Sequence, residues 1–396
     1  MPRIFRPNAS FEEEIRSGKL FPKHLEKRSS MIEAALLVLA GLQQNEKIIL
    51  TYSFPNQEWI SFWREKEISI QRPLLIPEMK NLQILNSEEV ILEEWGSISR
   101  WNRDGSLEID QKQYDLARRL SSKLNQSDWS SKFEPEFFSL SIRDTADWDR
   151  FKKSKMQNMD PNIHFVLKPE WSFAGGHKIS SSSQIDDVAE FLLTRKKEAF
   201  VLETWAQRTK DFSLLFHAEA GRFYTDAGTI LLSDPNGKYS GTWIGSHAEI
   251  EDYLSRMDEL LWKLQDFASE YEGYGSIDSF FFQNEKEMTL RKVSEVNFRW
   301  TMGRLLFELR KSSPKKEMSD LLLFLPQVKR SDPYNELRNW EKDTGWEILP
   351  LSPFHLASGL FCPKNLLWLR LPENSGPSPW EMAKMASDQG LARLCA

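Results

Sequence analysis

Apolar and polar residues alternate along the N-terminal part of the chain with two different periods. The apolar stretch at 31–42 predicts a buried helix. The residues at 47–54 are rich in strand formers, and further apolar runs lie at 82–85 and 90–92. Because helix and strand signals alternate in this way, we expect a small α/β domain.

The polar segment 101–110 separates this part from a longer series of elements. It contains the turn-forming residues Asn102, Asp104 and Gly105, so we predict an N-terminal domain over 1–110. Beyond it the pattern predicts, in order, a helix over 113–124, a strand over 163–169, a helix over 185–197, strands over 199–204 and 211–217, a helix over 250–268, and strands over 277–282 and 288–299.

The C-terminal part has a different pattern. Residues 312–317 indicate a linker or loop, and the tail to 396 mixes short apolar runs with prolines. Because prolines interrupt helices, we expect an extension over 311–396 that packs irregularly on the preceding domain.

Composition narrows the class of protein. A chain of 396 residues, 40% hydrophobic and 28% charged, is typical of a globular protein with two or three domains. The net charge of -6 predicts no general affinity for nucleic acid, and the 15 tryptophans are spread along the chain. Cys362 and Cys395 provide no disulfide framework, which fits a reducing cytoplasm. No apolar stretch is long enough for a membrane span, and the oligomeric state stays open.

The run from 288 to 299 carries candidate chemistry. In a strand, Glu295, Asn297 and Arg299 would share one face, because side chains two apart point the same way. Asp278, in the preceding strand of a hairpin, could then lie beside Glu295. Two carboxylates and an amide oxygen form a site that suits magnesium. An exposed charge pair between Glu295 and Arg299, which would contribute little, is the alternative.

A second candidate site follows the strand at 163–169. Lys168 stands at the end of this strand, and Gly175 and Gly176 lie in the small-residue loop that follows. Paired glycines let backbone N–H groups approach an anion, and a lysine neutralises its charge, although such a loop is more often a hairpin turn. The spacings of a Walker loop and of a GxGxxG fingerprint are absent. Lys152, Lys153 and Lys155 are interpreted as a solvated lysine cluster.

The order of these signals resembles the ATP-grasp superfamily. The resemblance covers about 121–303 and depends on Lys168 with the glycine loop, on Glu203 with Asp211, and on Asp278 with the segment from Glu295 to Arg299. It implies two α+β subdomains that clasp ATP over residues 111–310, preceded by a small α/β (pre-ATP-grasp) domain. Members of this superfamily usually activate a carboxylate as an acylphosphate, which an amine or a thiol then captures.

The resemblance also implies roles for residues around the nucleotide. Lys168 resembles the lysine at the α and β phosphates, and Lys123 resembles its partner. Gly175 and Gly176 would cover the phosphates. Glu203 and Trp205 would belong to the hinge that meets adenine, and Asp211 would accept hydrogen bonds from the ribose hydroxyls.

For the reaction centre the resemblance implies a metal set and two catalytic residues. Asp278, Glu295 and Asn297 would bind Mg²⁺, Arg299 would stabilise the transferring phosphoryl group or the substrate carboxylate, and Lys168 would act beside it. The expected partners are small molecules, a carboxylate and an amine or thiol. Two other functions stay open: a nucleotide-binding module that regulates a partner protein without catalysis, and a small-molecule kinase.

Overall fold

The N-terminal part of the chain forms a parallel sheet flanked by helices. In the computed structural model of the protein, the described residues are 3–8, 11–20, 26–44, 47–51, 55–75, 91–102, 106–154, 163–171, 178–181, 184–233, 239–283, 287–313, 318–328, 330–355, 362, 364–372 and 378–395. Strands β1 (Arg3–Arg6), β2 (Lys47–Thr51), β3 (Leu74–Leu75) and β4 (Ile91–Glu94) pair in the order β3-β2-β1-β4, all parallel. The expected α/β domain is thus confirmed, while the run at 82–85 lies outside the described residues.

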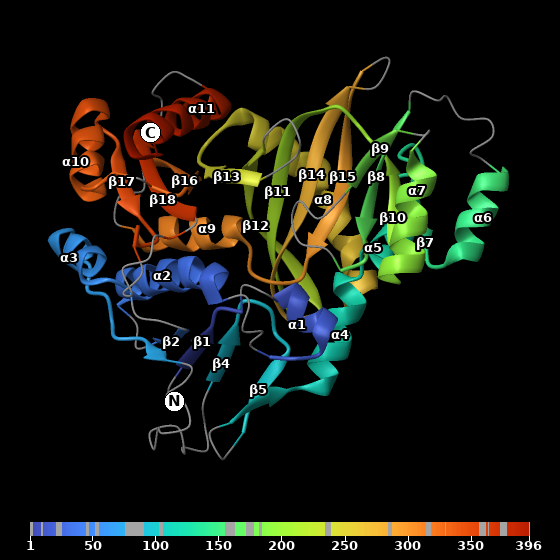
Figure 1. Ribbon diagram of the computed structural model, residues 1–396, viewed down its shortest axis with the longest axis horizontal. Coiled ribbons are helices and arrows are strands. Elements are labelled where there is room, and N and C mark those ends of the chain that lie inside the picture. Colours follow the sequence, from blue (N-terminus) through green and yellow to red (C-terminus); the bar gives the residue numbers. More distant parts are fainter. Residues whose placement is uncertain are drawn as a thin grey trace.

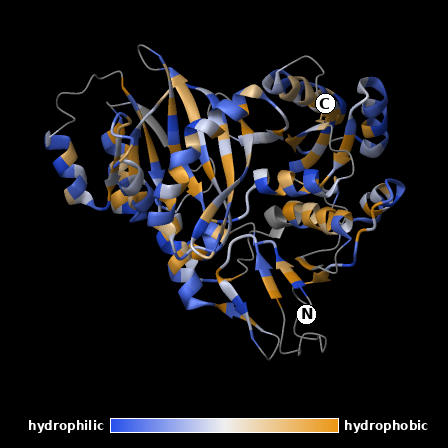
Figure 2. Cartoon of the chain, turned by 180° about the vertical axis from the view of Figure 1, so that it is seen from behind, coloured by the Kyte–Doolittle hydropathy of each residue, from blue (hydrophilic) through white to orange (hydrophobic). Residues whose placement is uncertain are grey.

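Helix α2 (Glu26–Gln43) lies between the N-terminal sheet and the rest of the protein (Figure 1). Every residue from 33 to 40 is buried, and Figure 2 shows this helix as mainly hydrophobic. A helix that is apolar on all sides packs against neighbours on all sides, and α2 contacts β2 as well as α9 (Met302–Ser312). Among the described helices, none is long and apolar enough to cross a lipid bilayer.

A second, antiparallel sheet follows the short helices α4 (Gln111–Ser121) and α5 (Lys123–Ser130). Its strand order is β7-β10-β8-β9, with bounds Ser139–Ile142, Phe200–Thr204, His164–Pro169 and Lys178–Ser181. Helices α6 (Thr145–Ser154) and α7 (Ile185–Glu190) cover it. Aromatic side chains fill its core, with Trp148 in contact with both Phe151 and Phe200. This is the smaller of the two lobes that enclose the candidate site.

The third and largest sheet has the strand order β15-β14-β11-β12-β13-β16-β18-β17. The strands from the predicted ATP-grasp region are β11 (Arg208–Glu219), β12 (Arg222–Ser233), β13 (Tyr239–Ile244), β14 (Gly273–Gln283) and β15 (Met288–Asn297). Helix α8 (Ala248–Ala268) packs over Gly228, whereas α9 packs over the next residue, Thr229. Because successive residues of a strand point to opposite faces, α8 and α9 cover opposite faces of this sheet.

The C-terminal extension continues this sheet, so the expectation of irregular packing is wrong. Strands β16 (Met318–Pro326), β17 (Glu347–Pro350) and β18 (Lys364–Pro372) are antiparallel, and β16 pairs with β13. Their prolines lie at strand ends, where no ladder hydrogen bond is lost. Helices α10 (Pro333–Thr344) and α11 (Pro379–Gly390) each begin with proline, which is favourable in the first helical turn.

Gly275, near the start of β14, tests how tightly the large sheet is packed. A Cβ at this position would lie 2.3 Å from the Phe216 ring and 2.6 Å from the carbonyl oxygen of Asn297. We expect Gly275→Ala to lower the free energy of unfolding by about 1–3 kcal/mol, as overpacking does, in urea-induced unfolding. In the control variant Gly303→Ala, the nearest side-chain atom would be 3.2 Å away, so stability should change by less than about 1 kcal/mol. Equal stabilities of the two variants would contradict this.

Candidate active site

Three neighbouring strands bring polar side chains into line across the large sheet. Ser213 on β11 lies opposite Asp278 on β14, and Asp278 lies opposite Glu295 on β15. The Ser213 hydroxyl donates to Asp278 Oδ1 at 2.7 Å, and Asn297 Nδ2 donates to Asp278 Oδ2 at 3.1 Å. Since Ser213 pairs with Thr229, these side chains lie on the face opposite α8. The register is the one that the sequence predicts for Asp278 and Glu295, whereas Ser213 carried no sequence signal.

The two carboxylates ionise differently. Burial, together with the neighbouring charge of Glu295, raises the pKa of Asp278 to about 6. Burial also opposes ionisation of Glu295, but Lys123 together with Arg299 and Lys168 outweighs it, so the pKa of Glu295 lies below its ordinary value. The carboxylate oxygens of this site are donors of the kind that suit a hard divalent cation.

Lys123 reaches this site from the start of α5. The predicted helix over 113–124 is interrupted, because Ser122 adopts an extended conformation and caps α5 through a hydrogen bond from the Asn125 backbone N–H. Lys123 is thus the first residue of a new helix. Its Nζ lies 2.7 Å from Glu295 Oε1, and its side chain is 12% exposed.

Lys168 approaches from the small sheet. Its Nζ lies 2.7 Å from Glu203 Oε2 and donates to the carbonyl oxygen of Ser294 on β15 at 3.3 Å. Burial lowers the pKa of Lys168, while Lys168 and Arg291 hold the pKa of Glu203 below its ordinary value against the effect of burial. Lys123 and Lys168 line one small cavity between the small and large sheets.

Arg291 and Glu134 form a buried pair behind the lysines, and sequence reasoning missed both. Arg291 NH1 lies 2.9 Å from Glu134 Oε2, and its NH2 lies 3.6 Å from Glu203 Oε1. Glu134 also accepts the backbone N–H groups of Lys292 and Val293. Through these contacts Arg291 connects β15 to the turn that follows α5 and to β10. The sequence contains a signal for Arg291, since it lies four residues before Glu295 in the same predicted strand and its side chain is therefore expected on the same face.

Of the three residues expected near adenine and ribose, Glu203 lies in the small cavity with the lysines, whereas Trp205 and Asp211 line a different, larger one. Trp205 and Asp211 contribute to a space of about 850 Å³ that also includes Arg208, 3.5 Å from Asp211 Oδ1. Burial raises the pKa of Asp211, and Arg208 opposes this effect. Helix α11 forms the far wall with Trp380 and Lys384. No sequence pattern linked α11 to this region.

Arg299 is not on the strand face that the sequence predicts. Strand β15 ends at Asn297, and the Arg299 guanidinium pairs with Glu12 of helix α1 (Phe11–Ser17) and donates to the Trp300 carbonyl oxygen at 3.0 Å. The chain turns here toward the N-terminal domain. Arg299 still lowers the pKa of both Asp278 and Glu295, although other causes are larger.

Two further predictions concern the phosphate loop and the metal. Gly175 and Gly176 lie outside the described residues. Within the described part of the chain, no group of three or more His, Cys, Asp or Glu side chains is placed to hold a metal ion. The candidate set consists instead of Asp278, Glu295 and the amide of Asn297. Oxygen atoms of this kind are the donors that magnesium prefers.

Comparisons with known proteins place the fold. No protein-family model and no curated protein matches the sequence. Among solved structures, N5-carboxyaminoimidazole synthase from Aspergillus clavatus, in complex with ADP and 5-aminoimidazole ribonucleotide, is similar with a TM-score of 0.54 and 12% identity, over 98% of this chain and 97% of that one. Phosphoribosylamine–glycine ligase from Thermotoga maritima has a TM-score of 0.56 and 11% identity, over 100% and 97%.

A third similar structure is biotin carboxylase from Campylobacter jejuni, with a TM-score of 0.56 and 11% identity over 91% of this chain and 89% of that one. At these identities the likeness concerns the fold alone. It extends along nearly the whole chain, including the N-terminal parallel sheet and the C-terminal strands. The resemblance found in the sequence is confirmed at this level: the chain has the ATP-grasp fold, preceded by a parallel α/β domain.

Proposed function

We propose that this protein is an ATP-dependent ligase that activates a carboxylate as an acylphosphate for attack by an amine or a thiol. The observation that carries the proposal is that Lys123 and Lys168, from outside the large sheet, both contact β15 beside the carboxylate set. Cationic side chains on one side and oxygen donors on the other suit a triphosphate with its metal. Structures with this fold in complex with ADP or ATP support the same reading.

The side chains can be given roles from their positions. Lys168 and Lys123 would neutralise the phosphates, and the ion pair between Lys123 and Glu295 would open as the nucleotide enters. Asp278, Glu295 and Asn297 would hold magnesium, which supplies charge neutralisation of the transferring phosphoryl group. Trp205 and Asp211 would bind the nucleoside in the cavity that α11 closes. Catalysis would thus rest on positioning and electrostatics, without a protein nucleophile.

The reaction can be written in two steps. A carboxylate oxygen of the substrate attacks the γ-phosphorus of ATP. The bond between the γ-phosphorus and the oxygen that bridges it to the β-phosphate breaks, and ADP leaves. The amine or thiol then attacks the acyl carbon, phosphate leaves, and the nucleophile loses a proton. Arg299, two residues beyond Asn297, would stabilise the acylphosphate once its pair with Glu12 opens.

The expected result in a steady-state assay is that ADP and phosphate appear together and depend on both organic substrates. A panel of amino acids and amines, supplied with ATP and Mg²⁺, should therefore include combinations that stimulate ADP release. Hydroxylamine should intercept the acyl group as a hydroxamate, because it competes with the natural nucleophile. Release of AMP and pyrophosphate would contradict the mechanism. A stable phosphorylated product would instead show a kinase, and ATP binding without any turnover would favour the regulatory module.

A further inference from the structure

Glu295 is the member of the candidate metal set that has a cation of the protein itself as its partner. The Lys123 Nζ donates to Glu295 Oε1 at 2.7 Å. The other two members bond to each other and to a neutral neighbour, since Asn297 and Ser213 both donate to Asp278. Part of the negative charge of Glu295 is therefore already offset where a metal ion would meet it.

The backbone of Lys123 is held in place from two sides. Ser122, the N-cap of α5, donates to Glu170 Oε1 at 2.6 Å, just beyond the end of β8. Further along α5, the side-chain amide of Gln126 donates to the Val296 carbonyl oxygen at 2.7 Å and accepts the Val296 N–H at 2.9 Å. Since β15 is the edge strand of the large sheet, these bonds attach α5 to its open side. The lysine is thus positioned by the fold, and its motion is left to its flexible side chain.

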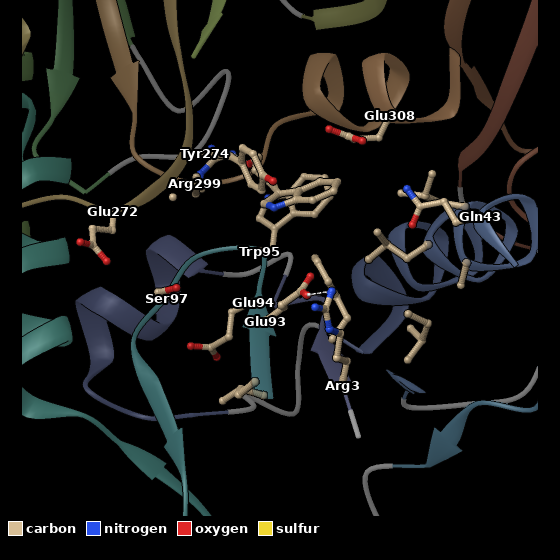
Figure 3. Close-up of a pocket in the computed structure, with 18 of the residues that line it drawn as sticks. Arg3, Gln43, Glu93, Glu94, Trp95, Ser97, Glu272, Tyr274, Arg299 and Glu308 are labelled. Atoms are coloured by element: carbon tan, nitrogen blue, oxygen red, sulfur yellow. Dashed lines mark hydrogen bonds and ion pairs between the residues drawn. The ribbon is translucent and has the colours of Figure 1, made fainter. Parts of the chain in front are cut away.

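The other cations near Glu295 have different partners. Lys168 pairs with Glu203 at 2.7 Å and donates to the backbone of β15. Arg299 pairs with Glu12 and is part of the lining of a separate cavity of about 330 Å³ between the N-terminal domain and the large sheet (Figure 3). Within the described part of the chain, the lysine at the start of α5 is therefore the cation that contacts this carboxylate.

Lys123 also has a place at the candidate phosphate site. Together with Lys168 it lines the small cavity between the small and large sheets. Phosphate oxygens accept strong hydrogen bonds from ammonium groups. A nucleotide phosphate in this cavity would draw Lys123 away from Glu295, and the carboxylate would regain the full charge that attracts a divalent cation. In the other direction, a dication on Glu295 would repel the ammonium group beside it.

We infer that Lys123 competes with the divalent cation for Glu295, so that the metal enters together with the nucleotide phosphates and binds weakly before them. Lys123 then has two roles, since it neutralises phosphate in the nucleotide complex and keeps a lone metal ion out of the site at other times. The inference rests on the proposed function for the metal set and for the phosphate role of Lys123. Its test uses the metal alone, so it does not depend on turnover.

The experiment is a titration of the full chain with Mn²⁺ without nucleotide, in which the electron paramagnetic resonance signal of the unbound ion gives the bound fraction. We expect Lys123→Met to bind Mn²⁺ about tenfold or more tightly than the native protein does, a ratio typical of two coupled binding events. Lys123→Gln, a second neutral variant, should behave in the same way. Lys123→Arg keeps the charge and should bind as weakly as the native protein. Lys132→Met, the same change at an exposed position after α5, is the matched control and should have no effect.

A double variant locates the metal. Lys123→Met/Glu295→Gln should return to the weak binding of the native protein, because the tighter site needs the charge of Glu295. A gain of affinity that persists in this double variant would overturn the inference, as would an equal gain in Lys132→Met. Equal affinities of the native protein and both neutral Lys123 variants, each shown to be folded by urea unfolding, would overturn it as well.

The outcomes also separate this inference from the ligase proposal. If Mn²⁺ affinity rises in the neutral Lys123 variants and depends on Glu295, but ATP is never turned over, the ligase function fails while the competition stands. If ADP release depends on the organic substrates and Mn²⁺ affinity is indifferent to Lys123, the ligase stands and the competition fails.

Discussion

Glu295→Gln is expected to lower ATP turnover by about two to three orders of magnitude, comparable to the loss of a positioned electrostatic group in other enzymes. The substitution keeps the shape of the side chain and removes its charge. A metal bound with the phosphates would then lose one anionic ligand. Initial rates of ADP formation under saturating ATP measure the effect.

The same change should leave folding nearly intact. The Glu295 side chain is 35% exposed, so its pair with Lys123 is expected to stabilise the fold by no more than about 1 kcal/mol. The unfolding midpoint should therefore shift by only a few degrees. Glu219→Gln, an exposed change at the end of β11, is the matched control and should retain full turnover. Full activity of Glu295→Gln in a folded protein would remove Glu295 from the reaction centre.

The pairing of Asp278 with Glu295 could be predicted from the sequence because it depends on local rules. A hairpin of two alternating strands has few possible registers, and a shift by one residue would turn every apolar side chain to the wrong face. The burial of Ile277 and Val296 beside the two carboxylates shows which register the core selects. Local alternation therefore predicted that Asp278 lies opposite Glu295.

The C-terminal extension could not be predicted in this way. The extension is connected to the large sheet by the pairing of β13 with β16, which are about 80 residues apart in the sequence. The sequence of neither strand indicates which strand it pairs with. Buried charges then fix the arrangement, since Asp320 accepts hydrogen bonds from Trp368 and Arg370 at 2.8 and 3.0 Å. Two of the prolines that suggested irregular packing mark the limits of regular elements instead: Pro372 ends β18 and Pro379 begins α11.

The position of Arg299 shows the same limit. The strand pattern that places Glu295 and Asn297 on one face also predicts Arg299 on that face. However, β15 ends at Asn297, so the pattern does not reach Arg299. What ends the strand is the N-terminal domain, through the bond of Trp300 to Trp95 and the pair of Arg299 with Glu12. These contacts join residues about 200 to 290 positions apart, so no local pattern could show them.

Lys168→Ala is expected to weaken ATP binding by about ten- to a hundredfold, the range for losing a hydrogen bond to a charged partner. The same substitution also disturbs the protein itself. It removes the partner 2.7 Å from Glu203, whose side chain is 6% exposed, and an uncompensated buried charge can cost about 3–5 kcal/mol. Arg291, 3.6 Å from Glu203, offsets part of that cost. Calorimetric titration with a non-hydrolysable ATP analogue measures the affinity, and urea unfolding measures the stability.

A second variant separates the phosphate role from the structural one. In Lys168→Ala/Glu203→Gln the buried carboxylate is neutral, so stability should recover much of its loss, whereas ATP affinity should stay low because the cation is still missing. Lys152→Ala is the matched control, since Lys152 pairs only with Asp149 and Asp186 among the described residues and lies at the surface of α6. Its ATP affinity should equal that of the native protein. Recovery of ATP binding in the double variant would mean that Lys168 serves to neutralise Glu203 and does not contact the nucleotide.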